Sequence, residues 1–162
     1  MRIALDAMGG DHAPRETVLG AFDGLAHLAP DDALLLYGPQ ERVEAECRAH
    51  NLSDPRVSIV HCSQTIEMDD SPVEALKQKR DSALVKMAGA AGKGDVHAII
   101  SAGNTGAFVA ACQLRIKPIA GVSRPGIAVT MPTFAGPAVI CDVGANVSPK
   151  PHHLLEYAQM CT

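Results

Sequence analysis

The sequence predicts an α/β fold in which helices cover both faces of a mostly parallel sheet. Short apolar runs rich in branched residues alternate with segments whose apolar residues recur at helical spacing. Only 3% of the residues are aromatic and none is Trp, so the core has to be built from aliphatic side chains, as in buried parallel strands. Because 162 residues with 47% hydrophobic content match an ordinary globular domain, we expect residues 1–162 to form a single α/β domain.

Six apolar runs have the length and composition of strands. Each is short, and each ends where glycine, proline or polar residues begin. The last two runs are separated by only a few residues, so we expect them to be neighbouring strands. The predicted strands are residues 2–5, 33–37, 57–60, 96–100, 127–131 and 138–141.

The segments between these runs have the spacing of helices. One helix is expected to begin at Pro14, which suits a first helical turn, and to end before Pro30. Residues 40–50 form a second predicted helix. Two more helices are expected to begin at residues 104–105 and at Pro151.

A long helix is expected from Ser71 to about Gly89. Ser71 and Glu74 match a capping box, and Pro72 lies just inside it. The simplest interpretation of the basic residues in this helix is a solvated face that Glu74 and Asp81 balance. These basic residues are Lys77, Lys79, Arg80 and Lys86.

Charge and cysteine content argue against several classes of protein. A net charge of −4 and a pI near 5.9 do not suit a general binder of nucleic acid, so no nucleic-acid partner is expected. The five cysteines are odd in number and lack CxxC spacing, so neither a disulfide framework nor a zinc site is expected. The sequence contains neither a signal-peptide pattern nor an apolar run of about 18 residues, which predicts a cytoplasmic location without a membrane span.

Residues 96–111 have the pattern of a strand, a tight turn and a helix. Unbonded N–H groups at a helix start, together with the positive end of the helix dipole, favour an anion. Polar side chains and two glycines at the turn make phosphate the expected ligand. The alternative is a turn that needs glycine only for its backbone angles. The predicted phosphate-binding residues are Ser101, Gly103, Asn104, Thr105 and Gly106.

Two further polar, glycine-bearing loops follow predicted strands, at residues 6–14 and 142–146. Open α/β sheets collect ligands at the carboxyl ends of their strands, so we expect one crevice to bring all three loops together. Aspartates that faced a phosphate would repel it, and we therefore expect them to orient the loops. The predicted loop-organising residues are Asp6, Gly9, Gly10, Asp11, Asp142 and Gly144.

These loops resemble the signature loops of the bacterial phosphate acyltransferases of phospholipid synthesis, the PlsX family. The matching segments are residues 6–14, 101–107 and 142–147, and further matches extend the resemblance over essentially the whole chain. The resemblance implies a fold similar to that of phosphate acetyl- and butyryltransferases. It also implies an acyltransferase that converts acyl-[acyl carrier protein] and inorganic phosphate into acyl phosphate.

The resemblance further implies partners and a longer protein. The acyl phosphate product would feed a membrane glycerol-3-phosphate acyltransferase, and the acidic carrier protein is expected to meet Lys79 and Arg80. Family members continue for about as many residues again, so we expect this chain to be an amino-terminal half. Homodimer contacts and any peripheral contact with the inner membrane face would then belong to the missing half.

Attack of phosphate on a thioester requires a held phosphate, donors for the developing oxyanion and a stabilised thiolate. It requires no metal or redox cofactor. His12 is predicted to move a proton, with a loop histidine bonded to backbone as the alternative, and Asn146 is predicted to donate to the oxyanion. Two other functions remain open: a short-chain phosphotransacylase that uses coenzyme A, and a non-catalytic phosphate-binding fragment.

Overall fold

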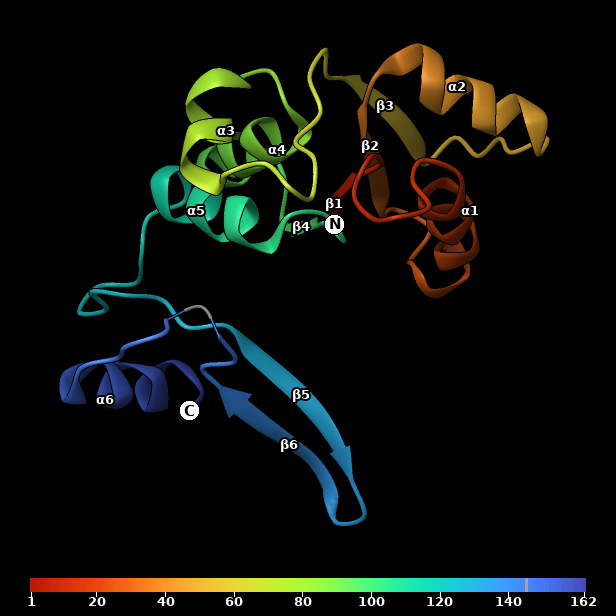
Figure 1. Ribbon diagram of the computed structural model, residues 1–162. Helices are drawn as coiled ribbons and strands as arrows, with labels where there is room; N and C mark the ends of the chain where they lie inside the picture. Colours follow the sequence, from red (N-terminus) through yellow and green to blue (C-terminus); the bar gives the residue numbers. More distant parts are fainter. Residues whose placement is uncertain (145) are drawn as a thin grey trace. The chain divides into compact units, whose positions relative to one another are not determined.

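The computed structural model describes residues 1–144 and 146–162, which form two compact units, Met1–Ile116 and Lys117–Thr162 (Figure 1). The first unit contains a parallel sheet and most of the helices. The second unit contains a hairpin and one helix. The α/β fold that the sequence predicts is therefore confirmed.

The sheet of the first unit has four parallel strands in the order β3-β2-β1-β4. Its central register places Ala4 of β1 opposite Leu35 of β2 and Ile99 of β4. The strands are β1 (Arg2–Asp6), β2 (Ala33–Gly38), β3 (Val57–His61) and β4 (Ala98–Ile100). The helices are α1 (Arg15–Gly24), the short η1 (Leu25–His27), α2 (Gln40–Ala49), α3 (Pro72–Gln78), α4 (Ala83–Lys93) and α5 (Thr105–Arg115).

Two apolar cores lie on opposite faces of this sheet. On one face, α1 and α2 bury Val18 and Val43 completely against strand residues such as Leu36. On the other face, α4 and α5 bury Met87 and Ala107 in the same way. Each large aliphatic side chain so buried stabilises the fold by about 1.5–3 kcal/mol. Both faces of the parallel sheet therefore hold a core, as the apolar strand sequences require.

The long helix predicted from Ser71 is wrong, because the chain forms two helices with a break at residues 79–82. In the break, the Asp81 N–H donates to the side chain of Gln64 at 2.9 Å, and the Asp81 carboxylate accepts from Ser63. These bonds to the loop before α3 replace helical ones. The expected capping box is also wrong in detail, since Ser71 makes no side-chain cap bond.

The second unit consists of β5 (Ala128–Thr133), β6 (Gly136–Cys141) and α6 (Pro151–Met160). The two strands pair antiparallel in a sheet of their own, with Ala128 opposite Cys141. The expectation that they are neighbouring strands is confirmed. Apolar side chains on the hairpin are exposed, including Val139 at 55% and Ile140 at 49%, and an isolated two-stranded hairpin has little stability of its own.

None of the helices in residues 1–144 and 146–162 has both the length and the apolar character that a membrane span requires.

Candidate functional site

The candidate site lies where the chain direction across the sheet reverses. From β1 the chain passes through α1 to β2 on one side, whereas β4 lies on the other side of β1 and leads into α5. The helices α1 and α5 pack on opposite faces, so the chain leaves β1 and β4 toward different faces at the carboxyl edge of the sheet (Figure 1). Open α/β proteins bind ligands at such a switch point.

A buried carboxylate joins these two loops. Asp6, at the end of β1, is 5% exposed, and it accepts hydrogen bonds from the Ser101 hydroxyl at 2.8 Å and the Met8 N–H at 3.1 Å. The Ser101 hydroxyl oxygen in turn accepts from the Gly103 N–H at 3.0 Å. Burial raises the pKa of Asp6, and these hydrogen bonds oppose that rise. Asp6 therefore organises both loops, and Ser101 is held within that network.

The loops approach each other so closely that only glycine fits at position 9. A Cβ on Gly9 would lie 2.8 Å from an Asp6 carboxylate oxygen, 2.8 Å from the Gly103 nitrogen and 2.9 Å from the Ser101 hydroxyl oxygen. The next residue, Gly10, has φ of +111°, a conformation that other residues rarely adopt. The Gly9-Gly10 pair thus lets one loop lie against the other and then turn away.

Asn104 caps α5 and also holds a third segment in place. Its side-chain oxygen accepts from the Ala107 N–H at 3.0 Å, as in a typical N-cap. Its side-chain nitrogen donates to the carbonyls of Glu67, Met68 and Asp70 at 3.2, 3.3 and 3.0 Å. The side chain is only 7% exposed. Asn104 therefore fastens the segment before α3 to the start of α5.

The first turn of α5 presents its backbone to solvent. Thr105 and Gly106 are exposed, and their N–H groups make no hydrogen bond within residues 1–144 and 146–162. Gly106 also allows α3 to pack closely, because a Cβ there would lie 2.8 Å from a Pro72 ring carbon. Two free donors at the positive end of a helix can bind an anion.

A cavity of about 420 Å³ opens at the same edge. Its wall includes Met8, Gly10 and Asp11 from the loop after β1, the segment 65–69, and Arg42 of α2. His12 lies exposed in the first loop, and its ring makes no hydrogen bond with any described residue. Arg42 likewise has no ion pair within the described part of the chain. Sequence reasoning missed Arg42, because nothing marks it among the other charged residues of a solvated helix.

The basic residues around α3 and α4 are largely neutralised. Lys77 pairs with Glu74 at 3.1 Å, and Lys86 pairs with Asp81 at 2.7 Å, which confirms the balanced face expected from the sequence. Lys79 pairs with Asp70, and its ammonium lowers the pKa of that carboxyl. The Arg80 side chain donates to the Lys77 carbonyl at 3.2 Å. Contact of Lys79 and Arg80 with a carrier protein stays a prediction.

The third loop belongs to the second unit, and it is organised by its aspartate. Asp142 accepts from the Ile127 N–H at 2.8 Å and from the Asn146 N–H at 2.7 Å. The Asn146 side chain also donates to Asp142 at 3.1 Å and to the Pro125 carbonyl at 3.2 Å. Gly144 has φ of +99°, which favours glycine. Whether this loop joins the other two in one crevice stays a prediction.

Comparison with known proteins identifies relatives of this chain. A family model described as "Fatty acid synthesis protein" matches residues 1–162. Proteins named phosphate acyltransferase are 45% identical in Geobacillus sp. (strain WCH70), 46% in Geobacillus thermodenitrificans and 43% in Staphylococcus aureus (strain Newman), each over 161 residues. Each match covers 99% of this chain and 47 or 48% of the relative. The chain thus spans about half the length of the curated relatives it matches.

Proposed function

The chain belongs to the fatty acid synthesis protein family, and on this premise we propose that it carries part of a phosphate acyltransferase. The proposed reaction moves a fatty acyl group from acyl carrier protein to inorganic phosphate. The observation that carries the proposal is the pair of free N–H groups at the start of α5, held at the switch point by the Asp6 and Asn104 networks. Such a site suits a small oxyanion.

In this reaction a phosphate oxygen attacks the carbonyl carbon of the thioester. A C–O bond forms, the C–S bond breaks, and the carrier leaves as a thiolate that takes up a proton. The Thr105 and Gly106 N–H groups would hold the phosphate in line with the carbonyl, which lowers the entropic cost of the encounter. Charge that develops on the carbonyl oxygen needs a donor, and we propose Asn146 for that role. Its side-chain amide donates to Asp142 and to the Pro125 carbonyl, so it would have to give up one of these bonds to reach the oxyanion.

We propose different roles for the predicted phosphate ligands, because their hydrogen bonds differ. Ser101 and Asn104 already use their polar atoms to hold loops, so we propose that they position the phosphate-binding backbone and do not themselves contact phosphate. Gly103 belongs to the same scaffold. His12 is exposed and its ring is unpaired among the described residues, so it is the proposed proton carrier.

We propose acyl carrier protein and inorganic phosphate as the substrates of the whole protein. A membrane glycerol-3-phosphate acyltransferase would consume the product. Homodimer formation, a cytoplasmic site and peripheral contact with the membrane are also proposals for the whole protein. The homodimer and the membrane contact follow from the family resemblance alone, whereas the cytoplasmic location is the expectation drawn from the sequence itself.

The direct test of the phosphate site is Thr105→Pro. Thr105 is the first residue of α5, where proline is tolerated, and the extended conformation of Asn104 suits a residue that precedes proline. The substitution therefore removes one free N–H and leaves the helix intact. Loss of a hydrogen bond to a charged ligand is worth about 1.5–3 kcal/mol, so phosphate affinity should fall at least about tenfold in titration calorimetry.

Thr105→Ala is the matched control, because it removes the side chain and keeps the N–H. Equal phosphate affinities for Thr105→Pro and the unmodified chain would refute the assignment. Acyl-phosphate formation should then be assayed with acyl carrier protein thioesters and with coenzyme A thioesters. Turnover with coenzyme A thioesters alone would favour a short-chain phosphotransacylase, and phosphate binding without turnover by this chain or an extended one would favour a non-catalytic module.

A further inference from the structure

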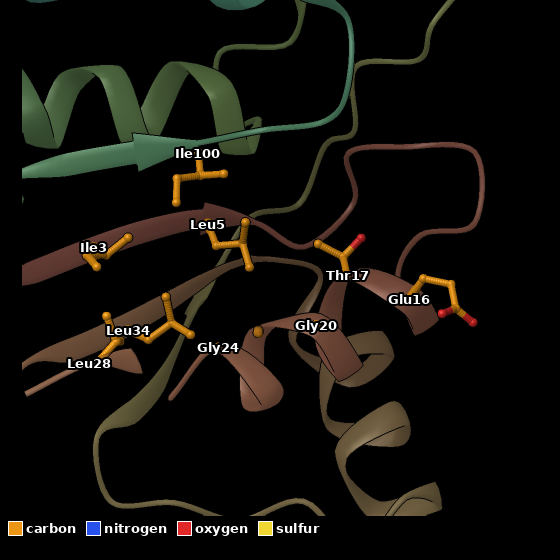
Figure 2. Close-up of a pocket in the computed structure, with 10 residues that line it drawn as sticks. Ile3, Leu5, Glu16, Thr17, Gly20, Gly24, Leu28, Leu34 and Ile100 are labelled. Carbon is orange, nitrogen blue, oxygen red and sulfur yellow. The ribbon is translucent and has the colours of Figure 1, made fainter. Parts of the chain in front are cut away.

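An apolar cavity lies on the α1 face of the sheet, where its lining residues Leu5 and Ile100 directly precede the loops of the candidate site. Its volume is about 320 Å³, and Figure 2 shows strand side chains on one side of it and α1 on the other. The strand side chains are Ile3 and Leu5 of β1, Leu34 of β2 and Ile100 of β4. Ile100 is 50% exposed, although it belongs to a strand of a parallel sheet.

Within the first unit, Met1–Ile116, this exposure marks a place where no helix covers the sheet. The helices α1 and α2 cover β1, β2 and β3 on this face, and their core includes Ile3 and Leu36. On the opposite face α4 and α5 pack over the sheet around Ala4 and Ile99. Parallel sheets are normally covered on both faces. Within Met1–Ile116, the region over β4, beside α1, therefore has a core on one face and no covering helix on the other.

The side of α1 that borders the opening carries small residues. Thr17, Gly20, Ala21 and Gly24 follow one another at helical spacing along the cavity wall. A Cβ on Gly20 or Gly24 would meet no described atom within 4 Å, so no neighbour within the described chain requires glycine at either position. Glycine inside a helix weakens it. Two glycines four residues apart do, however, allow the backbone of another helix to approach closely.

We propose that this cavity is the seat of an amphipathic helix from the half of the family's polypeptide that this chain does not cover. Three observations together favour a helix: the uncovered β4 face, the small-residue side of α1, and the coverage of only 47% of the Geobacillus sp. relative. The helix would lie beside α1 with its apolar face on Ile3, Leu5 and Ile100. The inference rests on the fold and on family membership, and it does not depend on the proposed reaction.

The test compares the 162-residue chain with the same chain joined to the part of the Geobacillus sp. phosphate acyltransferase that it does not cover. Ile100→Cys places a thiol in the cavity without adding bulk. Its alkylation by iodoacetamide is followed peptide by peptide, which separates it from the five native cysteines. We expect alkylation to slow at least about tenfold in the joined protein, because a covered thiol is not reached by the reagent.

Ala45→Cys is the matched control, since Ala45 is exposed on α2 and does not line the cavity. Its alkylation rate should be the same in both proteins. Equal rates for Ile100→Cys in the two proteins overturn the proposal. The proposal is also overturned if added myristate slows alkylation of the Ile100→Cys thiol in the 162-residue chain while the joined protein shows no slowing. That result identifies an acyl chain as the occupant. If that alkylation instead slows as the concentration of the 162-residue chain rises, again with no slowing in the joined protein, the occupant is a second copy of the chain and the proposal is overturned.

A second measurement covers the case in which the cysteine variants fold poorly. Gly20→Leu fills the cavity from α1, whereas Gly89→Leu makes the same change on α4, where a Cβ also meets no described atom within 4 Å. In the 162-residue chain both changes should keep or raise the melting temperature, because leucine favours a helix over glycine. In the joined protein Gly20→Leu alone should lower the melting temperature. A joined protein that tolerates both changes equally overturns the proposal.

Discussion

Asn104 provides the most direct check on the candidate site, because one side chain supports two separable functions. Its oxygen caps α5 through the Ala107 N–H, and its nitrogen contacts three carbonyls of residues 67–70. Asn104→Ala removes both functions. Asn104→Ser keeps a good N-cap residue but has no group that reaches residues 67–70.

The magnitudes follow from these contacts. Loss of an N-cap costs about 1 kcal/mol. The amide nitrogen carries two hydrogens, so its three contacts count as two hydrogen bonds, worth about 1–3 kcal/mol together. Asn104→Ala should therefore reduce the free energy of unfolding by about 2–4 kcal/mol. Asn104→Ser should lose about 1 kcal/mol less, because the cap remains.

Urea unfolding followed by circular dichroism measures both variants, with an unchanged m value as the sign that only stability has changed. Phosphate affinity should fall in both variants, and it should fall further in the variant that loses more of the free energy of unfolding. An Asn104→Ser variant as stable as the unmodified chain would refute the idea that Asn104 fastens residues 67–70. If that variant kept its stability and still lost phosphate binding, Asn104 would be a direct ligand.

Three further predictions follow from the same structure. Gly9→Ala should destabilise the fold by about 1–3 kcal/mol, because its Cβ would lie 2.8 Å from both an Asp6 oxygen and the Gly103 nitrogen. Urea unfolding measures this loss, with Gly20→Ala as the control. Equal stability of the two variants would show that the loops move apart easily. Hydrogen bonds from Lys86 and Ser63 lower the pKa of Asp81 below its ordinary value of 3.8, so this carboxylate stabilises the fold at neutral pH and loses that effect as the pH falls below 3.8. Asp81→Asn should therefore make the free energy of unfolding less dependent on pH in that range. An unchanged pH dependence below 3.8 would contradict the cause assigned. Arg80→Glu should slow association with acyl carrier protein at low salt, since Arg80 has no acidic partner among the described residues. An unaltered association rate in stopped flow would show that Arg80 does not contact the carrier protein.

Local patterns were sufficient to predict most secondary structure, since they depend on neighbours along the chain. Short branched apolar runs became the strands β1 to β6, each within a residue or two of the predicted bounds. The start of α5 was predicted at the correct place, because Asn104 is a strong capping residue. The break between α3 and α4 could not be predicted in this way. It depends on hydrogen bonds of Asp81, which accepts from Ser63 and donates to Gln64, and these residues lie 18 and 17 positions away in the sequence.

The candidate site shows the same division. Its glycines and polar residues could be identified from the sequence, because the chemistry of an anion site requires them in a strand-turn-helix pattern. Their tasks could not, since Ser101 and Asn104 use their polar atoms on partners 95 and 34–37 positions away in the chain. Arg42 was missed for a related reason, because only folding brings α2 to the edge of the cavity.

The sequence by itself determined the fold class, the positions of the ligand-type loops and the likeness to a family, because each depends on residue type and local spacing. Only the tertiary structure decided the strand order β3-β2-β1-β4, and with it the switch point where the Asp6 and Ser101 loops meet. Tertiary packing also decided that glycine is required at position 9 by contact and that the cavity beside α1 is open. The physical reason is that long-range pairing and close packing depend on which segments become neighbours in space, and periodicity along one segment does not contain that information.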